Sequence, residues 1–457
     1  MKRGRVMSNR SGQATIGLIG LAFILFLFVV LVFFQIPIDT AFIIILGTVI
    51  FAVSFINTDI ALIILIFSML LSPEFHAGGD VVGRTVKIRA DDVFIIVIFI
   101  GWFAKMAVNK ELGLFKSTAL NVPIGAYSLI CLLASFFAIL QGRIDFKSSV
   151  FYMLKYLEYF LLYFLVANNL KTREQAKKYM KFLFLTCALV CLYGLLFSHG
   201  AERVRGPFET EAGEPNTFAG YLIFMMALAM GFLLNLRSAN KKPFLLVPLG
   251  LAGVTFLLTL SRSGWISFFP MFLVIILLSK KARAGLVIIF ITGAILVPIL
   301  APSQVHKRVQ DTFSGPKLYQ MMGKKFAIDE SGQARIDSWQ IGFQRWIARP
   351  VFGYGIPAGA VIDNQYTRVL NETGVIGIAV FFWMLFTIFH VVWMVRRTMP
   401  EDDLAQSLTV GFLAGFAGLL LLSSSAAVFI IIKIMEPFWF VLAIIAALPS
   451  VPDSEKV

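Results

Sequence analysis

A succession of long apolar runs constrains this chain more than any other feature of its sequence. A membrane-spanning helix needs about 20 mostly apolar residues, and runs near that length recur along the whole chain of 457 residues. Lipid offers the backbone no hydrogen-bond partners, so runs that cross it fold as helices or as closed barrels. A hydrophobic share of 58% with only 14% charged residues excludes an ordinary soluble domain. The sequence therefore predicts an all-α, polytopic bundle of transmembrane helices.

The runs also predict how the chain is divided. Because several are short, we expect 12 to 14 spans among the candidates. The candidates are 16–34, 41–56, 60–71, 93–108, 122–140, 150–167, 182–198, 217–236, 244–260, 265–279, 285–300, 375–395, 407–422 and 426–448. No cleavage signal is evident, so we expect the first run to remain as an anchor. This division gives N-terminal helices over 1–300, a long polar loop over 301–373 and C-terminal helices over 374–457.

Loop charges predict the orientation. The basic residues fall in alternate loops: Lys110, Lys116, Lys171, Arg173, Lys177, Lys178, Lys181, Arg237, Lys241, Lys242, Lys280, Lys281, Arg283, Arg396 and Arg397. The positive-inside rule assigns these loops and both termini to the cytoplasm. The long loop, the stretch 199–216 and the joint 261–264 then lie outside. The net charge of +14 fits basic loops and anionic lipid, and we expect no nucleic-acid partner.

The long loop has the pattern of an ordered segment. Trp339, Phe343 and Trp346 recur at helical spacing, which predicts an amphipathic helix over 335–348 that buries an apolar stripe. Pro350 ends it, because the residue before proline avoids the helical region. A long loop between spans is functional or disordered, and this pattern favours a functional one.

A second helix is predicted to start near Val361 and to enter the membrane after Glu372. Asp363 and Glu372 are nine residues apart, which puts them on opposite sides of one helix. They form no catalytic carboxylate pair unless Gly374 or the preceding turn breaks that helix.

Several charged residues near or within spans need an explanation. Arg262 lies between two spans with almost no loop, where it is either a snorkelling interfacial anchor or an anion site assisted by a helix N-terminus. Arg203 and Arg205 occur in a loop that is either solvated or part of the same site. Lys155 and Glu158 occur in a span among tyrosines. They either line a cavity for a sugar or lipid headgroup or form a buried pair that fixes helix packing.

The sequence contains no metal or redox motif. Cys131, Cys187 and Cys191 all lie in apolar runs, and four scattered histidines have no ligand spacing. Asp91 and Asp92 are read as a charge pair at a helix N-terminus. We therefore expect no metal and no cofactor.

Four polar stretches follow one another in the second half. They are Arg205-Gly206-Pro207-Phe208 with Pro215-Asn216-Thr217-Phe218-Ala219-Gly220-Tyr221-Leu222; Ser261-Arg262-Ser263-Gly264-Trp265; Gly332, Arg335, Trp339, Pro350 and Gly353-Tyr354-Gly355; and Asp363-Asn364-Gln365-Tyr366 with Glu372, Gly374 and Gly377. In this order, with the long loop in place, the chain resembles the O-antigen ligase and O-antigen polymerase-like membrane proteins over residues 200–395.

The resemblance implies a GT-C-like membrane glycosyltransferase in the bacterial cytoplasmic (inner) membrane, with its active site on the outer face. Its donor would be a glycan linked to a polyprenyl (undecaprenyl) diphosphate, and its acceptor a growing glycan or the lipid A-core of lipopolysaccharide. No nucleotide sugar or metal is implied. Asp363 stands where family ligases typically have histidine. A carboxylate can also act as a general base, and this departure favours the polymerase-like or exopolysaccharide branch.

The resemblance also implies roles for individual residues. Arg262 would stabilise the leaving diphosphate and Asp363 would deprotonate the acceptor. The remaining expected contacts to diphosphate and glycan are Arg203, Arg205, Arg335, Tyr366, Trp339, Lys155, Glu158 and Glu372. Two other classes stay open. A flippase for the lipid-linked glycan would be expected to have internal repeats, and none is evident. A non-catalytic export subunit would tolerate substitution at Asp363 and Arg262.

Overall fold

The computed structural model describes residues 38–72, 74–81, 84–108, 116–198, 203–207, 215–237, 242–280, 282–300, 302–311, 317–321, 324–358 and 362–452. All structural statements below concern these residues. The first expected span, 16–34, and parts of the loop 199–216 lie outside them.

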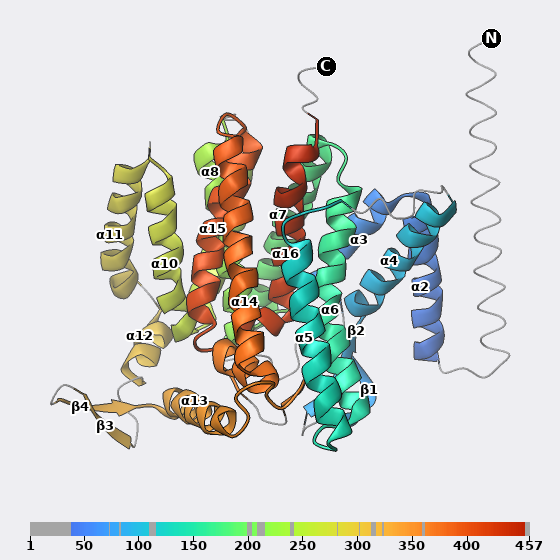
Figure 1. The fold of residues 1–457 in the computed structure, drawn as a ribbon. Coiled ribbons are helices and arrows are strands. Elements are labelled where there is room, and N and C mark those ends of the chain that lie inside the picture. The colour runs from blue at the N-terminus through green and yellow to red at the C-terminus, as the bar shows by residue number, and fades with distance from the viewer. Residues whose placement is uncertain are drawn as a thin grey trace, which may run out of the picture.

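The described chain is a bundle of helices with two short antiparallel hairpins at one end (Figure 1). The helices are α2 (Ile38–Ile56), α3 (Thr58–Leu71), α4 (Ala90–Val108), α5 (Asn121–Leu140), α6 (Phe146–Asn169), α7 (Arg173–Phe197), α8 (Pro215–Asn235), α9 (Lys242–Leu258), α10 (Arg262–Leu278), α11 (Arg283–Leu300), α12 (Ser303–Gln310), α13 (Glu330–Ala348), α14 (Gln365–Thr398), α15 (Asp403–Leu422) and α16 (Ile432–Ala447), with 3-10 turns η3 (Val428–Ile430) and η4 (Leu448–Ser450). The strands are β1 (Glu74–Val81) with β2 (Arg84–Arg89), and β3 (Lys317–Met321) with β4 (Lys324–Ile328).

Each predicted span that falls within these residues corresponds to a helix. In the part of the chain described, seven helices are long and apolar enough to cross a membrane, and five shorter apolar helices accompany them. The predicted all-α polytopic bundle is therefore confirmed. Two β-hairpins, which the sequence pattern did not predict, lie between helices.

The centre of the bundle depends on small residues. At Gly231 of α8, a Cβ would lie 2.4 Å from the carbonyl oxygen of Ser407 on α15. At Gly411 of α15, it would lie 2.6 Å from the Cα of Leu228 on α8. The two backbones thus touch, as small residues allow at helix contacts in membranes. This close pair forms the wall against which α10 and α16 pack.

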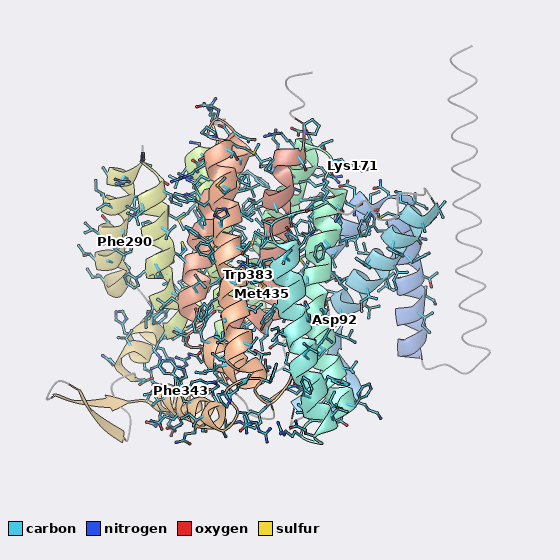
Figure 2. All side chains as sticks on the ribbon, viewed as in Figure 1. Asp92, Lys171, Phe290, Phe343, Trp383 and Met435 are labelled. Atoms are coloured by element: carbon cyan, nitrogen blue, oxygen red, sulfur yellow. The ribbon has the colours of Figure 1, made fainter. Side chains whose placement is uncertain are left out.

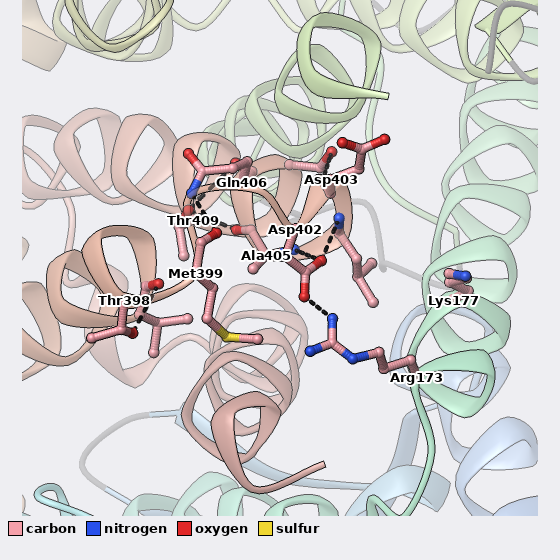
Figure 3. A network of polar contacts seen from close by, with 12 residues as sticks. Arg173, Lys177, Thr398, Met399, Asp402, Asp403, Ala405, Gln406 and Thr409 are labelled. Atoms are coloured by element: carbon pink, nitrogen blue, oxygen red, sulfur yellow. Dashed lines mark hydrogen bonds and ion pairs between the residues drawn. The ribbon is translucent and has the colours of Figure 1, made fainter. Parts of the chain in front are cut away.

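One end of the bundle gathers the basic loops. Figure 2 places Lys171 at this end and Phe343 of the long loop at the other. Arg173 forms an ion pair with Asp402, which also caps α15 by accepting the N–H groups of Leu404 and Ala405 at 2.9 and 3.0 Å (Figure 3). The two sets of loops predicted to lie on opposite sides are thus separated in space, and the assignment of the basic end to the cytoplasm stays a prediction.

At the other end, α13 lies across the bundle (Figure 1). It begins at Glu330, earlier than predicted, because Asp329 caps it through the N–H of Gly332 at 3.2 Å. Its apolar stripe is only partly buried within the chain: Trp339 is 40% and Phe343 52% exposed, while Ile336 and Trp346 are half-buried. The face that packs is the one with Ser338 and Gly342, because only a small residue fits there. A Cβ at Gly342 would lie 3.2 Å from Cβ of Thr367 on α14.

The start of α14 also differs from expectation. The helix begins at Gln365 and not near Val361, because Asn364 caps the N–H groups of Tyr366 and Thr367 at 2.8 and 3.0 Å. Asp363 therefore precedes the helix, and it does not share a helix with Glu372. A break at Gly374, with φ of 67°, divides α14 into a short first part and a long span. The nine-residue argument about opposite faces thus does not apply.

Candidate functional site

A glycine-rich turn fastens the long loop to the break in α14. Tyr354 donates its N–H to the carbonyl of Asn371 at 2.8 Å, and Gly355 donates to that of Glu372 at 2.9 Å. A Cβ at Gly374 would lie 2.0 Å from the carbonyl oxygen of Val351. Ile356 donates to Ser135 Oγ on α5 at 3.0 Å. The loop segment is therefore wedged between α5 and α14 and cannot shift independently of them.

Arg262 is the first residue of α10 and directly follows, in the sequence, a joint with strained backbone. Leu260 has φ of 51°, a region that costs a non-glycine residue about 1–2 kcal/mol. Ser261 caps α10 by accepting the N–H of Gly264 at 3.2 Å. Arg203, from the neighbouring loop, donates to the carbonyls of Thr259 and Leu260 at 2.9 and 3.2 Å. Arg203 thus holds the joint that presents Arg262.

Asp329 neutralises Arg262. The Nη2 of Arg262 is 2.5 Å from Oδ2 of Asp329, and the two side chains are only 13% and 16% exposed. The other oxygen of Asp329 caps α13. Burial favours a higher pKa for this carboxyl, but the hydrogen bond and charge of Arg262 outweigh it and lower the pKa. One carboxylate therefore joins α10 to the helix that lies across the bundle.

Further guanidinium groups gather around this pair. Burial, then the charges of Arg308, Arg262, Arg205 and Arg335, lower the pKa of Arg203 to about 10. Burial and the charge of Arg262 also lower the pKa of Arg335, against the opposing effect of Asp363 and Asp329. Arg203 and Arg335 are thus each within electrostatic reach of other arginines, and the five arginines come from four segments. Such an excess of fixed positive charge is suited to a multiply charged anion.

Asp363 lies at the edge of this arginine cluster. Its backbone N–H donates to Ser338 Oγ of α13 at 3.1 Å, and its side chain is exposed. It is close enough to act electrostatically on Arg335. An accessible carboxylate beside half-buried arginines can accept a proton from an incoming hydroxyl.

Glu372 is buried beneath the loop and has two partners. Arg368 Nε donates to Oε1 at 2.9 Å, and Tyr156 Oη donates to Oε2 at 2.7 Å. Glu372 is 1% exposed. It therefore organises α6 and α14 below the turn and does not face an open site.

Four other predicted contact residues form no hydrogen bond or ion pair with these arginines among the contacts described. Tyr366 donates its hydroxyl to the carbonyl of Leu420 on α15 at 2.7 Å. The expected Lys155–Glu158 pair is not formed, because Lys155 pairs with Asp92 of α4. The neighbouring tyrosines of α6 pack in the bundle interior, where Tyr159 stacks on Trp439 of α16 at 6.1 Å. Trp339 lies on the outward face of α13.

Three residues of the site were missed in the sequence. Asp329 stands directly before a helix with Glu330 in its first turn, a capping signal, but its pairing with Arg262 spans 67 positions. Arg308 of α12 follows His306 and Lys307, so it reads as one of a basic run. Ser338 gives no signal beyond its position on α13. Within the described residues, no three His, Cys, Asp or Glu side chains come together as a metal site.

These observations define the class: a multi-pass, all-α membrane protein whose extramembrane loop covers a cluster of arginines and carboxylates. Residues 244–382 match the family model described as O-antigen ligase. This match confirms the resemblance to the O-antigen ligase-like membrane proteins over the stretch that contains Arg262, Asp329, Arg335 and Asp363, and it supports a membrane glycan-transfer function of that type. No curated protein matches the chain.

Proposed function

We propose that the protein transfers or polymerises glycan from a polyprenyl-diphosphate-linked donor onto an acceptor hydroxyl at the outer face of the cytoplasmic membrane. The observation that carries this proposal is the cluster of five arginines beside an exposed aspartate. The acceptor would be a growing glycan or a lipid A-core, as the family match suggests.

The chemistry needs a base and a stabilised leaving group. Asp363 would take the proton of the acceptor hydroxyl while the hydroxyl oxygen attacks the anomeric carbon. The bond from that carbon to the diphosphate oxygen would break, and the lipid diphosphate would leave with the bonding electrons. Direct displacement by one base inverts the anomeric centre.

The arginines would supply the stabilisation. Fixed donors aimed at developing charge act strongly in a site that excludes water. Arg262 and Arg335 would bind the diphosphate, while Arg203 maintains the joint that presents Arg262. Asp329 would orient Arg262 and not block it, because a guanidinium has five N–H donors and one carboxylate does not saturate it.

The test is transfer by purified protein in nanodiscs, supplied with a lipid-diphosphate-linked oligosaccharide, with and without a lipid A-core acceptor. A product ladder without added acceptor indicates a polymerase, and a single transfer that requires the core indicates a ligase. Asp363→Asn and Arg262→Ala should each lose transfer by about 100-fold or more. Asp337→Asn is the matched control, because Asp337 lies on α13 and bonds to Gln333. Full transfer by folded Asp363→Asn and Arg262→Ala would refute the proposal, as would lipid translocation without transfer.

A further inference from the structure

A second group of charged side chains lies inside the bundle, apart from the arginine cluster. It comprises Arg89, Asp91, Asp92, Lys155, Glu158 and Glu436, from β2, α4, α6 and α16. Asp91 and Glu436 are 0% exposed, and Glu158 is 4% exposed. Ionisable residues inside a membrane bundle are costly and mark function.

Two of the four carboxylates have cations. Asp91 accepts hydrogen bonds from Arg89 Nε at 3.0 Å and from Ser72 Oγ at 2.6 Å, and Arg89 Nη2 is 2.9 Å from its other oxygen. Asp92 forms the ion pair with Lys155 and accepts the backbone N–H of Arg89 at 2.9 Å. Both of these carboxylates are therefore compensated in their ionised form.

In the other two carboxyls, buried oxygens have no hydrogen-bond donor among the described residues. Neither oxygen of Glu436 has a hydrogen-bond donor, and Oε1 of Glu158 also has none. Lys433, one turn before Glu436 on α16, has interactions of its own, but none is a hydrogen bond to Glu436. Both carboxyls instead lie within electrostatic reach of acids: the charge of Asp91 acts on Glu436, and that of Asp92 acts on Glu158.

This arrangement requires protons. An ionised carboxylate only accepts hydrogen bonds, so two carboxyl groups bond to one another only when one of them carries a hydrogen. We propose that the cluster is a proton-binding site, in which Asp91 with Glu436 and Asp92 with Glu158 each share one proton. The two shared protons balance the charge of four carboxyls against Arg89 and Lys155.

A proton fits this site better than a larger cation. Glu436 and Asp91 are closed off, and these carboxyls do not form a metal site. Asp92 and Lys155 keep 11% and 17% of their side chains exposed, which gives protons an entry. The shared protons would stabilise the packing of α16 against α4 and α6. Their release would leave additional negative carboxylates at this contact and weaken the packing.

Infrared spectroscopy of the full-length protein in nanodiscs tests this proposal. At neutral pH we expect a carbonyl stretch of protonated carboxyl groups, sensitive to deuterium exchange and lost on strong alkalinisation. Glu436→Gln and Glu158→Gln should each reduce it. Glu401→Gln is the matched control, because Glu401 is 90% exposed in a surface pair with Arg237, and it should leave the band unchanged.

The wild-type spectrum alone can overturn the proposal, since absence of the protonated-carboxyl band at neutral pH would mean that no proton is shared. A band that persists in full in both folded glutamine variants would also overturn it. A second readout is thermal stability. A folded state that binds more protons than the unfolded state loses stability as pH rises, and this decline should be smaller in each glutamine variant.

Discussion

Asp329→Asn tests how the arginine site is organised. Asparagine caps a helix about as well as aspartate, so the substitution keeps the start of α13 and removes only the charge opposite Arg262. We expect the Arg262 side chain to lose its fixed orientation and therefore to stabilise the leaving diphosphate less. The fold should be retained.

The size of the effect follows from the burial of the pair. Exposed ion pairs contribute about 0–1 kcal/mol, and breaking a buried pair costs about 3–5 kcal/mol. The side chains are 13% and 16% exposed, and the substitution weakens one charge-assisted hydrogen bond. We therefore expect a loss of about 1–2 kcal/mol of transition-state stabilisation. That corresponds to a decrease in kcat/KM of about 5- to 30-fold.

A double-mutant cycle separates orientation from general stability. Transfer is measured for wild type, Asp329→Asn, Arg262→Ala and the double variant, with Asp337→Asn as the control on the same helix. If Asp329 acts through Arg262, its substitution has no further effect in the Arg262→Ala background. An equal loss in both backgrounds would refute the reasoning, and so would faster transfer by Asp329→Asn, since that would make Asp329 a competitor of the diphosphate.

Other predictions follow from single contacts. Gly374→Ala should lower the free energy of unfolding by about 2 kcal/mol or more, because of its φ of 67° and a Cβ 2.0 Å from a carbonyl oxygen. Gly250→Ala is the control, because the space around its Cβ is open and its melting temperature should match that of the wild type. Equal melting temperatures of the two variants would contradict the prediction. Tyr156→Phe removes a donor from buried Glu372 and should cost about 1–3 kcal/mol, whereas an unchanged melting temperature would show that Glu372 does not need it. Arg203 donates to the carbonyls of Thr259 and Leu260, just before Arg262, so Arg203→Gln should weaken the binding of inorganic pyrophosphate in calorimetric titration. An unchanged affinity in the folded variant would show that Arg262 does not depend on this joint.

The membrane helices were predictable because each is specified by a local property, the length of an apolar run. The run 265–279 became α10 with little change at its ends. Arg262 was singled out for a similar reason, since a charge at the end of a span needs a specific explanation wherever the rest of the chain lies, and its role stays a prediction.

Pairings between distant segments were not predictable in this way. Lys155 and Glu158 are three residues apart, which suggests a pair, but the partner of Lys155 is Asp92, 63 positions away. Tyr366 follows Asp363 in the sequence, yet its hydroxyl reaches the carbonyl of Leu420, 54 positions away. The apolar stripe on α13 was read as a buried face, but the small residues on the adjacent face decided the packing.

The attachment of the long loop has a consequence for biosynthesis. Ile356 bonds to Ser135 and Glu372 to Tyr156, contacts that span 221 and 216 positions. Helices enter the bilayer as they emerge from the ribosome, so α5 and α6 are inserted while their partners are still untranslated. The two contacts that fasten the loop can therefore close only near the end of translation, and a nascent chain stalled before residue 356 would have neither of them.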